Sequence, residues 1–490
     1  MRREPIPRYE ELACFISSLV DKGALRPGSR APSLRRLSRE KHVSLSTALR
    51  AYQLLEDRGI LEARPRSGFF VARRPAATMA EPAVSRPPPT PNSVAISATV
   101  FTLVEYASDP RLVPLGWAIP SPELLAAGRL DRFLARAARV KGIDYNVYST
   151  PKGDPALRQE ICRRALRWGQ GWSPEDIVVT SGCTEALTLA LKAVAQAGDT
   201  IAIESPTYFG LLHVLEALSL RALELPTDPA TGVDFAALAH ALEQGPVAAC
   251  LFSSSFNNPL GCTMPDHRKR QVLQLLTKHR VPLIEDDIFG DIYFGAERPT
   301  PFGALDPAAD TIYCSSFSKT IAPGYRVGWL ASDRHLQAVL EQKLASTLAT
   351  PSLTQAALAE LLSCGGYDSH LRRIRRNFAE NIDRMTRVIE QSFPPGTRVS
   401  RPAGGFVLWV ELPETVDTRA LFWEAVRQGI CFAPGDAFSA SGRYNHCLRL
   451  SCGHRWDRRI EAGVETIGAL AATQAGGERS LSPAAAPRHS

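Results

Sequence analysis

Between about residue 99 and residue 472, short apolar runs of strand character alternate with stretches of helical periodicity. This alternation predicts an α/β domain with a largely parallel sheet, because parallel strands are joined by crossover helices. Four of the runs lead directly into polar clusters, and they cover residues 177–180, 200–204, 248–252 and 281–284. In open α/β sheets the ligand site lies just beyond the carboxyl ends of the strands. We therefore expect these polar clusters to meet at one ligand site.

The length of the chain indicates more than one domain. A single hydrophobic core rarely exceeds about 250–300 residues, and this chain has 490. Residues 74–98 are rich in proline and have no periodic apolar face, which indicates an extended linker. We predict four parts: a small domain at residues 1–73, the linker at 74–98, the α/β domain at 99–472 and a disordered tail at 473–490.

The small domain has the pattern of three helices followed by a β-hairpin. Apolar residues recur at helical spacing from Tyr9 to Asp21, and Ser33 and Ser44 offer N-caps for two further helices. We expect the last helix to bury one face, formed by Leu45, Ala48, Leu49, Tyr52 and Leu55. Two β-type runs then flank a basic turn. This order is typical of a winged helix-turn-helix, although the helices alone fit a small protein-interaction module equally well.

The excess positive charge of the chain lies in this small domain. Residues 1–74 hold 16 Lys and Arg against 8 Asp and Glu, whereas the whole chain carries a formal net charge of +7. A positive charge concentrated in this way favours a polyanion as the partner, and hence DNA. The polar and basic residues that face solvent in the predicted motif are the candidates for DNA contact: Arg35, Arg36, Ser46, Thr47, Arg50, Arg64 and Arg66.

Two segments of this domain resemble the GntR family of bacterial regulators. They are Pro32-Ser-Leu-Arg-Arg-Leu-Ser-Arg-Glu40 and Arg66-Ser-Gly-Phe-Phe-Val71. The resemblance covers roughly residues 5–73. It implies a winged helix-turn-helix that binds a double-stranded DNA operator.

Lys319 lies in a hydroxyl-rich turn between two strand-like runs. A lysine among small hydroxyls and apolar neighbours is desolvated, so the pKa of its ammonium falls and the free amine can form a Schiff base with a carbonyl. Pro323 and Gly324 turn the chain and bring Arg326 back near Lys319, where it can hold a phosphate. An isolated lysine before a turn is ordinarily a surface residue. The interpretation therefore depends on the order of the motif, Ser-x-Ser-Lys and then Pro-Gly-x-Arg-x-Gly.

This order resembles the cofactor-lysine motif of fold-type I enzymes that use pyridoxal 5'-phosphate, in the class I/II aminotransferase group. The cofactor needs donors for its phosphate, an anion for its ring nitrogen, a donor for its ring oxygen and a surface for stacking. The sequence offers a candidate for each need: Gly182, Cys183 and Thr184 for the phosphate, Asp286 for the nitrogen, Asn258 for the oxygen and Tyr208 for stacking. Arg449 is the candidate for a substrate carboxylate. Taken singly, these residues also fit a helix cap, a solvated loop, a turn and a core position.

Together these elements keep the order of the aminotransferase family across nearly all of residues 99–472. The resemblance implies that Lys319 is the catalytic lysine and that Ser316, Ser318 and Arg326 also bind the cofactor. It further implies that Tyr148 lends its hydroxyl group to the cofactor phosphate of a partner subunit.

One residue departs from the family pattern. The family usually carries a tyrosine that donates to the ring oxygen of the cofactor, and Phe289 stands in that place. Tyr293 substitutes for it only if the loop is rebuilt. The departure weakens the case for efficient transamination but leaves cofactor binding untouched.

As a whole, the chain resembles the MocR subfamily of GntR regulators. The resemblance implies a homodimer with swapped, head-to-tail domains. It also implies that the aminotransferase-like domain senses an amino acid, an amine or pyridoxal phosphate itself through the Lys319 aldimine. Two alternatives stay open: an active aminotransferase with an accessory DNA-binding head and, more remotely, a lyase that uses the same cofactor.

The sequence also bears on membranes, disulfides and metals. Nothing in it approaches the run of about 18 apolar residues that a membrane helix needs, and no apolar signal region follows the charged N-terminus. The 10 cysteines are scattered and include no Cys-x-x-Cys pair, which favours reduced thiols over a disulfide framework or a metal site. We expect a cytoplasmic protein without a bound metal or membrane.

Overall fold

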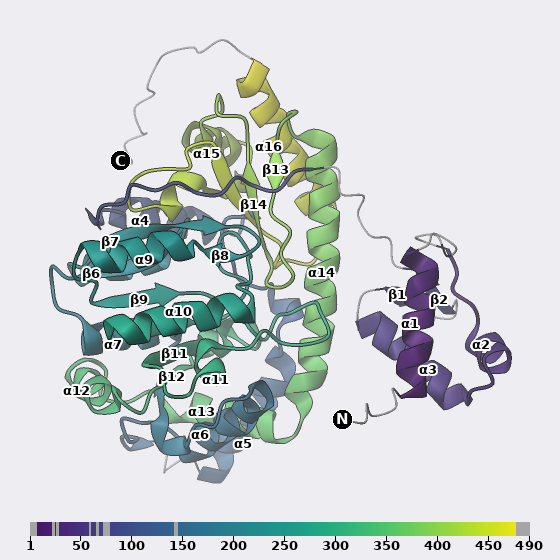
Figure 1. The fold of residues 1–490 in the computed structure, drawn as a ribbon, viewed down its shortest axis with the longest axis horizontal. Coiled ribbons are helices and arrows are strands. Elements are labelled where there is room, and N and C mark those ends of the chain that lie inside the picture. The colour runs from purple at the N-terminus through teal and green to yellow at the C-terminus, as the bar shows by residue number, and fades with distance from the viewer. Residues whose placement is uncertain are drawn as a thin grey trace. The chain divides into compact units, whose positions relative to one another are not determined.

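The computed structural model describes residues 7–21, 25, 29–57, 60–64, 68–71, 79–141 and 146–476. Two compact units make up the chain. The first, the head, comprises residues 1–78 together with residues 292–298, and the second, the body, comprises residues 79–291 and 299–490. Figure 1 shows the head as a small helical unit and the body as a layered α/β structure.

The head consists of three helices and an antiparallel hairpin, as predicted. The helices are α1 (Arg8–Asp21), α2 (Leu34–Glu40) and α3 (Leu45–Asp57), and the hairpin pairs β1 (Leu61–Arg64) with β2 (Gly68–Val71). The Oγ atom of Ser33 accepts a hydrogen bond from the backbone amide of Arg36 at 3.3 Å. The Oγ atom of Ser44 accepts one from the amide of Thr47 at 3.1 Å. Both predicted N-caps are therefore confirmed, and they begin α2 and α3.

The buried face of α3 differs from the predicted one. Ala48, Ala51 and Tyr52 are fully buried, but Leu45 and Leu49 keep 51% and 40% of their surface exposed. The prediction that these two leucines face the core is wrong. The small side chains of the alanines allow α3 to pack closely against α1, so this face turns inward and the leucines lie on the flank of the helix.

A central sheet organises the body. Among the described residues nine strands form it, in the order β3 (Asn92–Ser93), β7 (Arg221–Asp228), β6 (Thr200–Ser205), β9 (Ala249–Phe252), β10 (Leu283–Asp286), β11 (Thr311–Ser316), β12 (Gly328–Ala331) and β5 (Ile177–Thr180), with β8 (Gly232–Val233) paired to β7. Strands β7, β6, β9, β10 and β11 are parallel to their neighbours in this series, while β12 is antiparallel to both β11 and β5. The predicted α/β class with a mostly parallel sheet is confirmed.

The strand positions predicted from the local sequence pattern lie close to the observed ones. The predicted run 177–180 coincides with β5. The run predicted at 281–284 is shifted, because β10 begins at Leu283. Pro282 has no backbone N–H group to donate to the ladder, although its carbonyl oxygen accepts a hydrogen bond from the Cys250 amide at 3.0 Å.

Helices cover both faces of the sheet (Figure 1). On one face, Leu238, Val272 and Phe252 belong to a buried cluster that joins α9 and α10 to the strands. On the other face, α7 packs against β11 and β12. Within the described residues the helices of the body are α4 (Ser97–Ala107), α5 (Ala127–Lys141), α6 (Pro155–Ala165), α7 (Cys183–Val194), α8 (Phe209–Ala217), α9 (Phe235–Gln244), α10 (Asp266–His279), α11 (Phe302–Leu305), α12 (Leu336–Ser346), α13 (Ser352–Ser363), α14 (Gly366–Ser392), α15 (Thr418–Arg427) and α16 (Arg458–Gly476).

A second, smaller sheet completes the body. It is antiparallel and orders β13 (Arg398–Val399), β14 (Val407–Glu411), β17 (Cys447–Ser451) and β16 (Ala433–Pro434). A short parallel pair joins β4 (Val113–Pro114) to β15 (Ile430–Cys431). This pairing brings the segment after β4 next to the smaller sheet, because Val113 and Ile430 lie opposite each other in its register.

Most of the predicted linker, residues 79–96, is extended and is bound to the body. The backbone oxygen of Ala80 accepts a hydrogen bond from the Val399 amide at 3.0 Å, next to the smaller sheet. The amide of Ala83 donates to Glu411 Oε2 at 2.8 Å. Further along, Ser85 Oγ accepts a hydrogen bond from the Thr227 amide of β7 at 2.7 Å. The extended form follows from the prolines, and these contacts attach residues 79–96 to both sheets.

All ten cysteines lie in the described part of the chain, and all are free thiols. Eight are buried, whereas Cys14 and Cys364 are exposed. In the portion that the structure describes, no helix is long and apolar enough to cross a membrane. No group of three or more His, Cys, Asp or Glu residues there is arranged to hold a metal ion.

Candidate functional site

Lys319 lies where β11 ends, in the short 3-10 helix Phe317–Lys319. Ser316 begins this turn, because its Oγ atom accepts a hydrogen bond from the Ser318 amide at 3.1 Å. The Nζ atom of Lys319 donates to the backbone oxygen of Ala118 at 2.7 Å. Burial, reinforced by the positive charge of Arg449, lowers the pKa of Lys319 to about 8. At neutral pH roughly a tenth of this side chain is therefore an uncharged amine, a far larger share than an ordinary lysine reaches.

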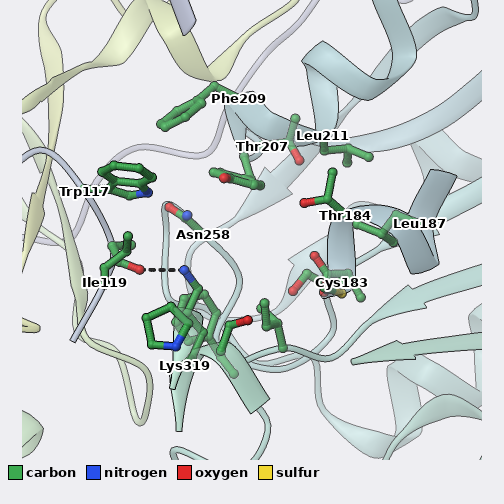
Figure 2. Close-up of a pocket in the computed structure, with 18 of the residues that line it drawn as sticks. Trp117, Ile119, Cys183, Thr184, Leu187, Thr207, Phe209, Leu211, Asn258 and Lys319 are labelled. Carbon is green, nitrogen blue, oxygen red and sulfur yellow. Dashed lines mark hydrogen bonds between the residues drawn. The ribbon is translucent and has the colours of Figure 1, made fainter. Parts of the chain in front are cut away.

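The Lys319 amine faces a cavity of about 310 Å³ (Figure 2). Loops at the carboxyl ends of the central strands line it, as does β17 of the smaller sheet. Nine of the residues predicted from sequence line the cavity together: Cys183, Thr184, Tyr208, Asn258, Asp286, Ser318, Lys319, Arg326 and Arg449. The expected meeting of polar clusters at one edge of the sheet is therefore seen in the structure.

One end of the cavity suits an anion. Helix α7 begins there, directly after Gly182, and its first backbone N–H groups have no partner within the helix. Gly182 adopts a φ of 84°, which a residue with a side chain rarely adopts. The guanidinium group of Arg326 lies against Gly182, and its Nη2 atom donates to the backbone oxygen of Ser181 at 2.9 Å. Positive charge and free amide groups thus converge at this end.

Asp286 ends β10 and supplies a carboxylate inside the cavity. Burial raises the pKa of Asp286 to about 6, so the group is mainly ionised at neutral pH. The Cys183 thiol donates a hydrogen bond to its Oδ1 atom at 3.4 Å. Burial also raises the pKa of Cys183 well above its usual range, which keeps this thiol protonated. A buried carboxylate of this kind favours a cationic partner.

Arg449 marks the other end of the cavity. It lies in β17, is fully buried, and donates through Nη2 to the backbone oxygen of Gly116. Burial lowers the pKa of Arg449 to about 10, so the side chain stays charged at neutral pH. Its Nε and Nη1 atoms have no hydrogen-bond partner among the described residues. A buried cation with unsatisfied donors favours an anionic ligand such as a carboxylate.

The remaining predicted residues have distinct positions. Gly182 borders the cavity through its contact with Arg326. Ser316 is buried and does not line the cavity; its Oγ atom donates to Val327 O at 2.9 Å and accepts a hydrogen bond from Ser318 Oγ at 2.8 Å. Tyr148 lies outside the cavity of its own chain, with 86% of its surface exposed.

Phe289 occupies the cavity wall without a hydroxyl group. It is buried, and its ring centroid lies 5.3 Å from that of Phe406 in an edge-on contact. Tyr293 is absent from the cavity lining. Asn258 reaches the cavity as predicted, and its Oδ1 atom is buried without a hydrogen-bond partner in the described chain.

Several cavity residues were missed by the sequence analysis. Trp117 and Ile119 follow β4, in a segment without strand–helix alternation that only the pairing with β15 brings to the site. Phe209 follows Tyr208 directly, so its proximity was detectable. Glu204 ends a predicted strand, and burial raises its pKa to about 8; the Ser253 amide donates to its Oε2 atom at 2.8 Å. Its protonated form then lies beside the cavity at neutral pH.

The head exposes most of its predicted DNA-contacting residues. Arg35, Arg36, Ser46 and Arg50 are exposed and Thr47 is partly exposed. Among them, Arg36 is paired with Glu40 at 2.6 Å and Arg50 lies over the ring of Tyr9 at 4.5 Å. The side chain of Arg64 and all of Arg66 lie outside the described residues.

Two protein families match this chain. The family described as aminotransferase class I and II matches residues 121–467. The family described as bacterial regulatory proteins, gntR family, matches residues 8–71.

Individual relatives reflect both matches. The chain is 38% identical over 463 residues to YdcR of Escherichia coli strain K12, called an uncharacterized HTH-type transcriptional regulator, covering 94% of this chain and 98% of the relative. It is 30% identical over 376 residues to the 2-aminoadipate transaminase of Thermus thermophilus, covering 76% of this chain and 93% of that enzyme.

A solved structure extends the similarity to three dimensions. LysN, the alpha-aminoadipate aminotransferase of Thermus thermophilus, superposes with a TM-score of 0.71 at 28% identity. The match covers 78% of this chain and 99% of that one. That structure is a complex with N-(5'-phosphopyridoxyl)-L-leucine.

Proposed function

Because the chain belongs to the class I and II aminotransferase family and also carries a gntR-family head, we propose that it is a MocR-type transcriptional regulator. Its head binds a DNA operator, and its body binds pyridoxal 5'-phosphate and senses an amino acid or an amine. The observation that carries this proposal is that a cofactor-type cavity around Lys319 and a basic helix-turn-helix occur in one chain.

Pyridoxal 5'-phosphate is the cofactor of this family, and the cavity fits it on three observations. Asn258 Oδ1 is a buried polar atom without a partner in the described chain, and it faces the cavity. Gly182 has no Cβ atom, which lets the Arg326 guanidinium lie against the start of α7. Lys319 and Asp286 present an amine and a carboxylate to the same space. When bound, the cofactor supplies an aldehyde that reacts with primary amines and a ring that withdraws electrons from them.

Each side chain then has a defined task. Arg326 and the first amides of α7 hold the phosphate. Asp286 binds a protonated ring nitrogen, and its ionised state at neutral pH permits this. Lys319 offers a neutral amine because of its lowered pKa, and the oxygen of Ala118 orients that amine. Arg449 binds the carboxylate of an amino acid.

The proposal includes a homodimer with swapped, head-to-tail domains. The exposed side chain of Tyr148, which lies outside the cavity of its own chain, supports the idea that its hydroxyl serves the phosphate of a partner subunit.

An active aminotransferase with an accessory head is the second candidate. The 30% identity to the 2-aminoadipate transaminase favours it. Phe289 weighs against it, because this residue brings no hydroxyl group into the cavity.

The test of the proposal is operator affinity at fixed salt. The cofactor-loaded protein is titrated with a panel of amino acids and amines while DNA binding is measured. One member of the panel should change the affinity of the wild type but not that of Lys319→Ala. Lys192→Ala, which removes an exposed lysine from α7, should respond like the wild type. Equal responses from the wild type and Lys319→Ala would show that sensing does not pass through this lysine.

A further inference from the structure

The arrangement of the two ends of the cavity indicates where an amino acid binds. Arg326 lies against the start of α7, whereas Arg449 donates to the oxygen of Gly116. Lys319 donates to the oxygen of Ala118, two residues further along. A ligand whose carboxylate meets Arg449 and whose amine meets Lys319 therefore has its α-carbon beside the segment 116–119.

The wall at this end of the cavity is apolar. Trp117 and Ile119 line it, and both are only half-buried, so part of their surface is available to a ligand. Phe209 also lines it, and its ring packs 5.4 Å from that of Phe438, which lies 5.6 Å from the Arg449 guanidinium carbon. In Figure 2, Trp117 and Ile119 lie on one side of the cavity, away from Cys183 and Leu187. A ligand side chain leaving the α-carbon thus meets aromatic and aliphatic surface.

The charges of the cavity decide which side chains are accepted. Among the described residues, the cationic side chains that line it are those of Lys319, Arg326 and Arg449. Each already serves one group: the amine, the phosphate and the α-carboxylate. A second carboxylate on the ligand would be desolvated without a cation of this chain to pair with it. The acidic residues in the lining are Asp286, committed to the ring nitrogen, and Glu204, whose raised pKa leaves it mainly uncharged, so a basic ligand side chain also lacks a partner.

We propose that the body recognises α-amino acids with an uncharged, apolar side chain, and that Trp117, Ile119 and Phe209 select this side chain. The inference rests on the proposed sensing function, whose ligand class it names. It excludes dicarboxylic and basic amino acids as preferred ligands. It also predicts that the α-carboxylate is needed, because two nitrogen atoms of Arg449 have no hydrogen-bond partner in the part of the chain that the structure describes.

The test is calorimetric binding to the full-length, cofactor-loaded protein. The probes are L-leucine, L-phenylalanine, L-glutamate, L-lysine and isopentylamine, which is leucine without its carboxylate. L-leucine or L-phenylalanine should bind at least about tenfold more tightly than L-glutamate, L-lysine and isopentylamine. Wild-type protein that binds L-glutamate or L-lysine as tightly as the apolar amino acids overturns the inference but leaves the sensing function standing. If none of the five probes binds while the cofactor is held, both the inference and the sensing of amino acids fail.

A charge-introducing variant sharpens the test. Ile119→Lys supplies the missing cation, so it should shift the preference toward L-glutamate by about tenfold or more relative to L-leucine. Leu166→Lys is the matched control, because Leu166 is 65% exposed and lies outside the cavity. Cofactor absorbance shows whether each variant keeps an intact site. If an Ile119→Lys protein with an intact site keeps the wild-type preference, Ile119 does not select the ligand side chain. If this variant does not hold the cofactor, the inference is judged on the order of affinities of the wild-type protein alone.

Discussion

A Cβ atom on Gly182 would lie 2.6 Å from Nη2 of Arg326. Gly182 directly precedes helix α7 at the anion end of the cavity, and Arg326 is the arginine that lies against it. Their backbones are 144 positions apart in sequence, yet the guanidinium group uses the space that the missing side chain leaves. The position of Arg326 thus depends on a glycine at 182.

We expect Gly182→Ala to displace Arg326 and to weaken the binding of pyridoxal phosphate at least tenfold. The positive φ of 84° adds strain, so the free energy of unfolding should fall by about 1–3 kcal/mol. Cofactor titration by absorbance and urea denaturation measure the two effects. Gly171→Ala is the control, because no atom of the described residues lies within 4 Å of a Cβ atom there. A Gly182→Ala protein with unchanged cofactor affinity would contradict the role given to this contact.

Asp286→Asn should stabilise the cofactor-free protein. Burial raises the pKa of Asp286 from 3.8 to about 6, so the folded state keeps a proton that the unfolded state releases between these values. The stability contributed by this group therefore falls as the pH rises through that window. Above pH 6 the variant should be more stable than the wild type by up to about 3 kcal/mol. Urea denaturation from pH 5 to pH 8 measures this difference.

The same substitution should weaken cofactor binding, because it removes the anion for the ring nitrogen. With excess pyridoxal phosphate the wild type should then regain its stability relative to the variant. A stability difference that does not change with pH would show that the buried charge is not its cause.

Phe289→Tyr should place a hydroxyl group in the cavity. A phenolic donor near the ring oxygen of the cofactor stabilises its anionic form, so the pH midpoint of the bound-cofactor absorbance should move downward. Any slow transamination should rise. Phe101→Tyr, at a position 69% exposed, controls for the added phenol. An unchanged midpoint would mean that another group already supplies this hydrogen bond.

Arg35→Gln and Arg50→Gln should weaken operator binding. If the side chains reach bases, the binding free energy should weaken by about 1–3 kcal/mol. If they contact phosphates, the slope of log K against log salt concentration should become shallower by about one. Fluorescence anisotropy across a salt series distinguishes these cases. Arg387→Gln, on an exposed position of α14 in the body, should leave DNA binding unchanged. Undiminished affinity in both head variants would place the DNA-contacting surface elsewhere.

The sequence predicted those features that depend on local pattern. The strand before Ser181 and the two N-caps of the head are set by neighbouring residues, and both were located correctly. The gathering of Asn258, Asp286 and Lys319 was predictable because parallel strands place their carboxyl ends at one edge of a sheet.

Features that depend on distant contacts were not predictable. Trp117 reaches the cavity only through the pairing of β4 with β15, which joins residues more than 300 positions apart. The attachment of residues 79–96 depends in the same way on a long-range contact, the hydrogen bond from the Ala83 amide to Glu411. The exposure of Leu49 depends on how closely α3 approaches α1, and spacing along one helix does not reveal that distance.

The pattern of thiol exposure makes the native chain suitable for distance spectroscopy. Cys14 lies on α1 of the head and Cys364 lies at the end of α13 in the body, and both are exposed, while the other eight thiols are buried. A thiol-reactive fluorophore or spin label should therefore attach preferentially at one position in each unit. Energy transfer or electron–electron coupling between the two labels would then report how far the head moves when DNA or an amino acid binds, with no residue replaced.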